Sequence, residues 1–557
     1  MRIASLGLAA FVLLDSAAGA TNAGSSPPSL AVSIRKADAA YQNLPASLSA
    51  YNRAVLEICA AMEVQGPPQF ASSLKELGVS FDMPKIGLPL RHLQIAALSS
   101  ASNTMPAAGI PMVVGYDTKN APLYPPEGLF VDATAIYDRA TGQPRFSILS
   151  NRSTVKLNGR TYALAANHTG AGDHLKLRAK HLARSGFANM IRPFSGLRKP
   201  QIYLLDPYDP NKLPLLMVHG LQSTPVEFAG LVNALRADPV IRSGYQIWQF
   251  YYASGTPVLV NAAALRDSLV QTIHAVDPKD HDAGPKRIVL LGHSMGGVIS
   301  HTLVSSSHNQ VWASVFRVPP SRLKGDRNTI RELEHLLFFQ RNPRVVRVIF
   351  MAAPHRGSPI ADSFIGFMGN YLTRLSPMLE HGFSQLANVN PEAMTPEAAI
   401  FYKGRFSAVR TLSPKSTALI ALAKLPIEVP YHSVIGQHYR GPKERGSDGV
   451  VPYWSSHIDG AQSELIVRSG HGVFSNLDAV LETIRILHLE QRSSKRSTWR
   501  SSSSHRPIFS AVFPSQSHSL QPSRCAGTLA AQPELDPRGT AQSRFVGLSG
   551  LMNFAML

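Results

Sequence analysis

The segment RIVLLGHSMGGVIS, residues 287–300, places a serine between glycines at the end of an apolar run. Residues 288–291 are typical of a buried parallel strand, and the residues from Val298 onward have helical character. A serine in a sharp turn between a strand and a helix is exposed as a nucleophile, and glycines let the two elements pack closely. An ordinary tight turn would use the same small residues, so Ser294 is a candidate nucleophile that needs partners.

A suitable acid and base follow later in the chain. A serine hydroxyl attacks well only when a base removes its proton, and a carboxylate must fix the tautomer of an imidazole base. In sheets of this kind the order is serine, acid, histidine, with the partners in loops after later strands. Asp448 follows the run YHSVIGQ in GSDGVVP, and His471 follows SELIVRSG in a Gly-His-Gly turn. The order predicts Asp448 as the acid and His471 as the base.

Four other residues were candidates for these roles. His457 and Asp459 lie before the last expected strand rather than after it, so we interpret His457 as a surface residue and keep Asp459 as the alternative acid. His293 adjoins the serine, but neighbouring side chains diverge around a sharp turn. His219, in VHGLQ, is interpreted as a structural hydrogen-bonding residue.

Acyl transfer also needs two N–H groups aimed at the developing oxyanion, each contributing about 3 kcal/mol. Met295, directly after the serine, supplies one from its backbone. Leu221 is the candidate for the other, because it follows an expected strand ending at Val218 and a glycine that lets the backbone turn. A plain strand-to-helix turn would also fit VHGLQS.

The elements that would position these residues alternate between strand and helix from about residue 213. This alternation predicts an α/β fold with a doubly wound, mostly parallel sheet that helices cover on both faces. The expected strands are LPLLMVHG, YQIWQFYY, KRIVLLGHS, RVVRVIFMAAP, YHSVIGQ and ELIVRSGH.

The preceding part of the chain has a different pattern. Apolar residues recur at helical spacing from Leu48 to Met62, and Pro67 and Pro68 end that helix. Short β-rich runs follow between about 110 and 205, the last of them QIYLL, and Asn158-Gly159 predicts a hairpin. We therefore expect an accessory region over 21–200, helical and then β-rich, before a catalytic domain over 201–490.

Composition limits the possible partners. The chain has 557 residues, 44% of them hydrophobic, which is enough for two or three domains with a sizeable core. Two cysteines, Cys59 and Cys525, exclude a disulfide framework and a thiolate zinc site. The net charge of +19 is compatible with peripheral contact with an anionic membrane. The sequence has no zinc-finger spacing and no basic motif interleaved with aromatic residues, so it does not indicate nucleic-acid binding. It gives no indication of the oligomeric state.

The compositions of the two chain ends predict a cleaved segment at the N-terminus and a tail at the C-terminus. Residues 1–20 combine one arginine, an apolar stretch and small residues near Ala20, which is the layout of a secretory signal peptide. We therefore expect export to the periplasm, cell envelope or medium. Residues 491–557 are rich in serine, arginine and proline, so we expect a disordered basic tail.

The motifs LLMVHGLQ, GHSMGG, MAAPHRGSPIADSF and SDGVV and the late histidine occur in this order over about residues 201–490. Together they resemble the α/β-hydrolase fold, and within it the bacterial lipase and serine-esterase branch. The resemblance implies Ser294 as nucleophile, Asp448 as acid, His471 as base, and Leu221 and Met295 as oxyanion donors, without a cofactor. It places residues 354–357 at the pocket edge.

Several features depart from the family. Residues 21–200 have no counterpart in the simple secreted lipases, and the disulfide of some of those lipases is missing. In the calcium-dependent members, an aspartate two residues after the catalytic histidine binds Ca²⁺, whereas this chain has Val473. A valine supplies no oxygen ligand, and we expect Asp478 in the next helix, pointing away. We therefore expect no metal, and a histidine loop held by Val473 and Phe474.

Residues 364–379 carry an amphipathic, methionine- and aromatic-rich stretch that fits either a lid over an acyl-binding cleft or an ordinary core helix. The sequence predicts an exported carboxylic-ester hydrolase that acts through an acyl-enzyme on lipid-like or other apolar small-molecule esters. Two alternatives remain open. One keeps the same three residues for acyl transfer or thioester cleavage, and the other is a non-catalytic envelope protein on a hydrolase scaffold.

Overall fold

The computed structural model describes residues 29–96, 107–139, 142–150, 152–179, 199–361, 377–401 and 408–503. The expected signal peptide lies outside these residues, as does the chain beyond 503. Most of the stretch 364–379 is also outside them, and only its last residues enter a described helix, α13. Among the described residues, no helix has the length and apolar character needed to cross a membrane.

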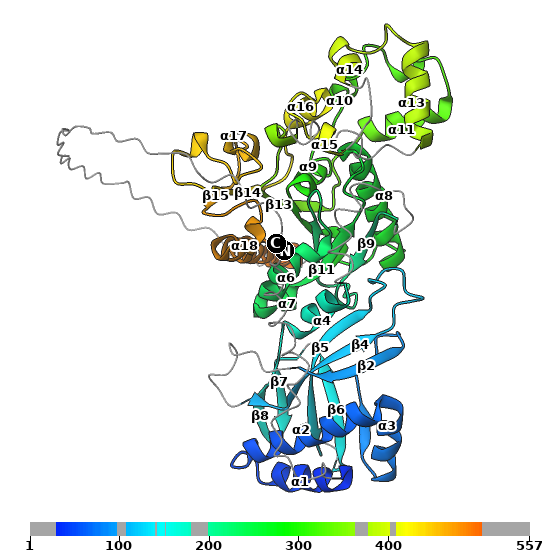
Figure 1. The fold of residues 1–557 in the computed structure, drawn as a ribbon. Coiled ribbons are helices and arrows are strands. Elements are labelled where there is room, and N and C mark those ends of the chain that lie inside the picture. The colour runs from blue at the N-terminus through cyan, green and yellow to red at the C-terminus, as the bar shows by residue number, and fades with distance from the viewer. Residues whose placement is uncertain are drawn as a thin grey trace, which may run out of the picture. The chain divides into compact units, whose positions relative to one another are not determined.

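A seven-stranded sheet forms the centre of the part that contains the candidate site (Figure 1). Its order is β15-β14-β13-β12-β10-β11-β9, and every neighbouring pair is parallel except β9 with β11. Each of the six expected strands is present. QIYLL continues the β-rich runs in the sequence but lies inside the expected catalytic domain over 201–490, where it forms the antiparallel edge strand β9. The strands are β9 (Gln201–Leu204), β10 (Leu213–Val218), β11 (Tyr245–Tyr251), β12 (Ile288–His293), β13 (Val345–Met351), β14 (Tyr431–Gly436) and β15 (Ser463–Val467).

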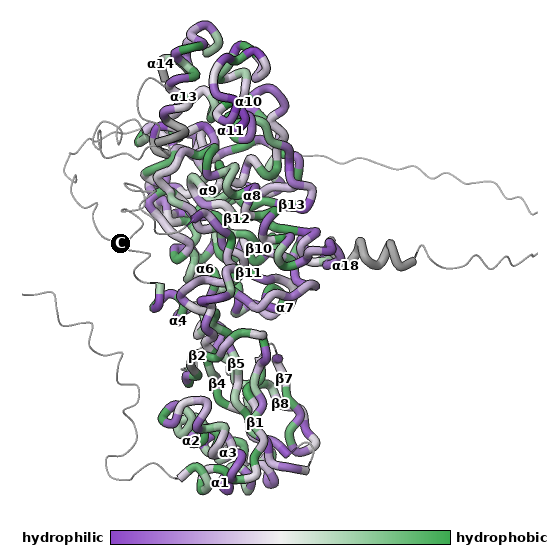
Figure 2. Tube along the Cα trace, turned by 90° about the vertical axis from the view of Figure 1, so that its right-hand side faces the viewer, coloured by the Kyte–Doolittle hydropathy of each residue, from purple (hydrophilic) through white to green (hydrophobic). Residues whose placement is uncertain are grey.

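Successive residues of the central strands enter two different cores. Leu216 and Leu290 belong to one hydrophobic cluster, while Leu215 and Leu291 belong to another, as the period of two along a strand requires. Hydrophobic residues recur along β10 and β12 in Figure 2. Helices cover both faces. One set is α8 (Val258–Val276), α9 (Met295–His301), α11 (Arg327–Leu337) and α16 (Thr417–Ala423), and the other is α6 (Ala229–Ala237), α7 (Pro239–Gly244) and α18 (Leu477–Ser503).

The accessory region has its own core, built from its first three helices and two smaller sheets. Its first predicted helix ends at Gln65, immediately before Gly66 and the two prolines, as expected. The predicted hairpin is also confirmed, because Asn158 and Gly159 have φ values of 43° and 77° between β7 and β8. The elements are α1 (Leu30–Gln42), α2 (Leu48–Gln65), α3 (Pro67–Glu76), β1 (Ser80–Asp82), β2 (Leu90–Ile95), β3 (Ala107–Ala108), β4 (Ile110–Tyr116), β5 (Leu129–Asp138), β6 (Arg145–Ser150), β7 (Thr154–Leu157), β8 (Arg160–Leu164) and α4 (Gly170–Arg178).

The expected start of the tail at residue 491 falls inside a helix. Ile486 and Leu487 are fully buried, and the Glu490 carboxylate binds the guanidinium of Arg347 at 2.9 Å, so α18 is anchored just before that point. The helix continues to Ser503. A polar composition did not stop it, because a helix that packing has already started can be extended by residues of ordinary propensity.

Further helices lie in the segments that follow the parallel strands, most of them no longer than six residues. They are η1 (Pro225–Phe228), α10 (Gln310–Ala313), α13 (Pro377–Val389), α14 (Pro396–Phe401), α15 (Ala408–Thr411), α17 (Tyr453–Ser456) and η5 (Val473–Ser475). The β strands therefore present their carboxyl ends to a set of loops and short helices, which is where parallel sheets carry their ligands.

Candidate active site

Ser294 occupies a sharp turn between β12 and α9. Its φ of 53° and ψ of −125° lie in a region that side chains rarely adopt, and its backbone N–H donates to the Met351 carbonyl at 2.8 Å. Glycines make the turn possible. A Cβ added at Gly296 would lie 2.1 Å from the Val218 carbonyl oxygen, and one at Gly292 would lie 2.6 Å from the Gly296 oxygen. The turn is strained, as at many functional sites.

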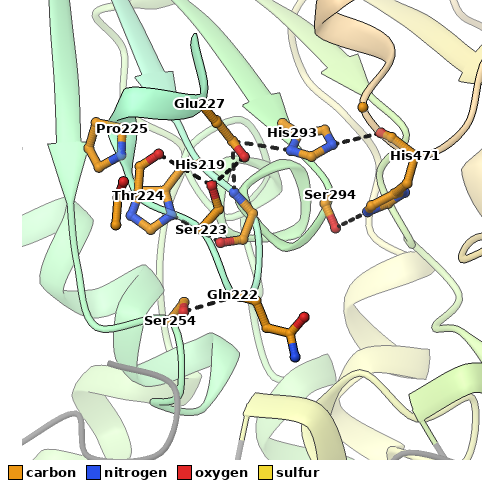
Figure 3. A network of polar contacts seen from close by, with 12 residues as sticks. His219, Gln222, Ser223, Thr224, Pro225, Glu227, Ser254, His293, Ser294 and His471 are labelled. Atoms are coloured by element: carbon orange, nitrogen blue, oxygen red, sulfur yellow. Dashed lines mark hydrogen bonds and ion pairs between the residues drawn. The ribbon is translucent and has the colours of Figure 1, made fainter. Parts of the chain in front are cut away.

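The structure brings Ser294, His471 and Asp448 into one hydrogen-bonded chain. Ser294 Oγ donates to His471 Nε2 at 2.8 Å, and His471 Nδ1 donates to Asp448 Oδ2 at 2.7 Å (Figure 3 shows the serine–histidine contact). Because the carboxylate only accepts, it fixes the proton on Nδ1 and leaves Nε2 free to take the serine proton. This geometry is the one that activates a serine nucleophile.

Asp448 is held from its other oxygen. Its Oδ1 accepts from the backbone N–H groups of Val450 at 2.8 Å and Val451 at 2.7 Å, and the residue is only 4% exposed. The end of β14 packs tightly beneath it, because a Cβ added at Gly436 would lie 2.7 Å from Asp448 Cβ. The carboxylate therefore has one fixed orientation toward His471.

The two expected oxyanion donors flank the serine. Met295 is the first residue of α9, so helix geometry leaves its N–H without an acceptor within the helix. On the other side, an added Cβ at Gly220 would lie 3.0 Å from Ser294 Cβ, which places the turn carrying Leu221 beside the nucleophile. Gln222 has a φ of 58° and donates its N–H to Ser254 Oγ at 3.2 Å, which fixes this turn.

Asp459, the alternative acid, contacts His457 rather than Ser294 or His471. His457 Nε2 contacts Asp459 Oδ1 at 3.0 Å, and its Nδ1 binds Glu464. The hydrogen bond that His457 donates to the Glu464 carboxylate is the main cause that raises the pKa of His457 above its usual value. The Asp459 side chain is 92% exposed. In the described structure, His471 Nδ1 faces Asp448 instead.

His219 has the structural role expected of it. Its ring stacks on Tyr252 with centroids 4.1 Å apart, and Nδ1 contacts the Gly220 carbonyl at 3.0 Å. Burial lowers the pKa of His219 to about 4, so the ring is neutral and Nδ1 donates.

His293 points away from Ser294, as expected, but its partner was not foreseen. Its Nδ1 contacts Glu227 Oε1 at 3.1 Å (Figure 3). The sequence offered one signal for Glu227, a lone carboxylate in the otherwise apolar segment PVEF.

Residues 354–357 brace the loop that carries Asp448. The Arg356 guanidinium donates to the His457 carbonyl at 2.8 Å, and the neighbouring Ser358 hydroxyl donates to the Val450 carbonyl at 2.5 Å. Gly357 has a φ of 84°, and a Cβ there would lie 2.7 Å from the Leu412 carbonyl oxygen. The contacts to Val450 and His457 join this segment to both ends of the stretch that follows Asp448.

Val473 and Phe474 pack beneath the His471 loop as expected. Val473 is fully buried, and Phe474 lies edge-on to His293 and Phe228 with centroid distances of 4.8 and 5.6 Å. Asp478 is exposed in the first turn of α18. Among the described residues, no group of three or more His, Cys, Asp or Glu side chains is arranged to hold a metal ion.

These contacts give a prediction for calcium. EDTA is expected to leave activity and melting temperature unchanged, and Val473→Asp is expected to destabilise the protein by about 3 kcal/mol or more, because it buries an unpaired carboxylate. Ester turnover and thermal melting measure both. Ser475→Asp, which adds a charge at an exposed position of the same loop, is the control and should change little. Inactivation by chelator that Ca²⁺ restores and Mg²⁺ does not would contradict packing as the support of this loop.

Comparison with known proteins gives structural neighbours alone, since no family model and no curated protein matches the chain. Neighbours include the mature form of Bacillus licheniformis lipase BlEst2, with 17% identity and a TM-score of 0.30 over 50% of this chain and 94% of that one. EstA from Clostridium botulinum has 15% identity and a TM-score of 0.28, over 48% of this chain and 84% of that one. The metagenomic carboxyl esterase MGS0156 has 16% identity and a TM-score of 0.28, over 56% of this chain and 91% of that one. The structural neighbours are thus bacterial lipases and esterases, at similarities too low to assign this chain a family.

Proposed function

We propose that this protein is an exported serine hydrolase of the α/β-hydrolase type that cleaves carboxylic esters with apolar acyl groups. One observation carries the proposal, the continuous chain from Ser294 Oγ through the His471 imidazole to the buried Asp448 carboxylate. The composition of residues 1–20 supports export, and N-terminal sequencing of the mature protein tests it.

The geometry supports a two-step reaction. Ser294 Oγ attacks the ester carbonyl carbon while its proton passes to His471 Nε2, and the N–H groups of Leu221 and Met295 stabilise the oxyanion. The tetrahedral intermediate collapses, the alkoxide leaves with the proton from His471, and an acyl-serine remains. Water then gives its proton to the same nitrogen and attacks the acyl-serine. This step releases the carboxylic acid and restores Ser294.

An apolar cavity on the α9 side of the sheet supports an aliphatic acyl group. It has a volume of about 80 Å³ and is bounded by α8, α11 and α16, with Val258, Leu333 and Leu419 among its walls. These wall residues belong to the same hydrophobic cluster as Met295, the residue after the nucleophile. An acyl chain buried there would gain about 0.8 kcal/mol per methylene.

A cavity-filling variant tests this substrate preference. Leu419→Trp is expected to lower kcat/KM for long-chain p-nitrophenyl esters at least about tenfold while sparing acetate, because a bulkier side chain removes room for one to three methylenes. Ile420→Trp is the matched control, since Ile420 is 39% exposed on the same helix and does not line the cavity. An unchanged chain-length profile in Leu419→Trp would show that the acyl chain binds elsewhere.

Acyl transfer to an alcohol and thioester cleavage would use the same three residues. A non-catalytic scaffold would not need them aligned. The direct test is a fluorophosphonate probe, which reacts with an activated serine. Stoichiometric labelling at Ser294, located by peptide mapping, supports catalysis, whereas a folded protein that neither reacts nor hydrolyses esters would overturn the proposal.

A further inference from the structure

His293 lies between two hydrogen-bond acceptors that cannot donate. Its Nδ1 is 3.1 Å from Glu227 Oε1, and its Nε2 is 3.0 Å from the backbone carbonyl oxygen of His471 (Figure 3). A carboxylate and a carbonyl only accept, so both ring nitrogens must carry a proton for both contacts to be hydrogen bonds. That ring is an imidazolium, and the Glu227 carboxylate balances its charge. The His293 side chain is only 6% exposed and the Glu227 side chain only 10%.

Glu227 also binds the turn that carries one oxyanion donor. Its Oε1 accepts from the Gly220 backbone N–H at 3.1 Å, and its Oε2 accepts from the Ser223 hydroxyl at 2.5 Å. Leu221 lies between these two contacts in the chain. Figure 3 shows Glu227 placed between Ser223 on one side and His293 on the other.

The two residues therefore connect three parts of the site. We propose that Glu227 and His293 form a buried ion pair. The pair positions three parts of the site relative to one another: the turn that carries Leu221, the turn that carries Ser294, and the backbone of His471. They are positioning residues and touch no reacting atom. This inference rests on the proposed function, because it assigns the pair to the same reaction.

Burial opposes charge on both groups, yet each favours the other's charged form. Burial alone would lower the pKa of His293, but the charge and hydrogen bond of Glu227 raise it above its usual value. Burial alone would raise the pKa of Glu227, but the charge and hydrogen bond of His293 lower it. The other titratable groups that interact with the pair are His219, Tyr252, His471 and Asp448, and Asp448 adds to the rise in the pKa of His293.

The sign of the pH dependence follows from these directions. A raised pKa of His293 means that its contribution is present at low pH and is lost as pH rises through the folded-state value. A lowered pKa of Glu227 means that its contribution is lost as pH falls through that value. The ion pair is therefore intact between these two limits, and its loss at high pH adds an alkaline limb to activity.

Glu227→Gln tests the charge while keeping an amide oxygen that accepts from Gly220 and His293. Without the carboxylate, the largest effect that opposes burial is gone, so the pKa of His293 falls and the neutral ring is favoured. A neutral ring carries one N–H and can donate either to the His471 carbonyl or to the glutamine oxygen, but not to both. We expect kcat/KM for a p-nitrophenyl ester to fall about a hundredfold, mainly in kcat, because small displacements of reacting groups have effects of this size. The alkaline limb should move to lower pH by about one unit or more.

His293→Gln is the second variant, because it offers an uncharged N–H to the His471 carbonyl and should lower kcat similarly. His457→Gln is the matched control, since it removes another carboxylate-paired histidine that does not contact Ser294 or His471, and it should keep the wild-type profile. Thermal melting of each variant shows whether it is folded.

A measurement on the wild type keeps the test independent of the variants. The ¹⁵N spectrum of histidine-labelled protein should show a buried imidazole that is doubly protonated at neutral pH, and a neutral His293 ring would overturn the ion pair. Folded Glu227→Gln and His293→Gln variants with wild-type kcat/KM, or with a uniform loss and an unmoved alkaline limb, would also overturn it. Failure of the proposed function looks different, because the wild type itself would then neither hydrolyse esters nor react with the probe.

Discussion

Ser294→Ala is expected to lower ester turnover by about six orders of magnitude, the scale on which loss of a serine nucleophile acts. The fold should persist. The Ser294 hydroxyl has one hydrogen bond in the structure, to His471 Nε2, and a typical hydrogen bond contributes about 1 kcal/mol. The backbone strain at φ 53° is the same for alanine as for serine, so the turn keeps its shape.

Turnover of a p-nitrophenyl ester, with thermal melting alongside it, measures this result. Ser305→Ala is the control, because Ser305 is fully buried and its hydroxyl donates to the Pro426 carbonyl at 2.7 Å, away from His471. It should lose stability of similar size without losing turnover. Retention of more than a few per cent of activity by Ser294→Ala would show that the nucleophile has been misassigned.

Asp448→Asn is expected to lower kcat by about 10⁴. The asparagine oxygen can keep accepting from Val450 and Val451, so the loop stays in place. Its NH₂ group then faces His471 Nδ1, which must accept, and the imidazole proton moves to Nε2. An Nε2 that carries a proton cannot take one from Ser294. The variant is therefore folded and holds the wrong tautomer.

Asp459→Asn separates this explanation from the alternative acid. Asp459 is exposed and contacts His457, so its replacement should leave kcat within about twofold of wild type, as surface changes usually do. If Asp459→Asn instead produced the large loss and Asp448→Asn did not, the acid would be Asp459 and the described loop geometry would not be the active one.

The parts of the site that follow strands were predictable from the sequence. Ser294, Asp448 and His471 lie in the segments that follow β12, β14 and β15, and parallel strands bring the segments after their carboxyl ends to one edge of a sheet. The pairing and direction of QIYLL were not predictable, because a run with four apolar residues carries no information about its neighbour in a sheet. β9 is set by its pairing with β11.

Glu227 could not be assigned a role for a related reason. Its partner His293 is 66 residues away in the chain, and only the folded sheet brings the two together. An isolated carboxylate near a helix start reads as an exposed residue that favours the helix dipole. The end of α18 was not predicted, because the polar composition of residues 491–503 indicates a tail. In the structure these residues extend a helix that the buried Ile486 and Leu487 anchor.

The positions of the strands in the seven-stranded sheet have a consequence for durability. Ser294 follows β12, whose six residues are all buried, with a strand on either side. His471 follows β15, an edge strand with one neighbour and four of its five residues only half-buried. Edge segments with few buried contacts open more often than central ones. We therefore expect the nucleophile and its base to belong to regions of unequal local stability, so that on heating activity is lost by opening of the β15 edge before the whole domain unfolds.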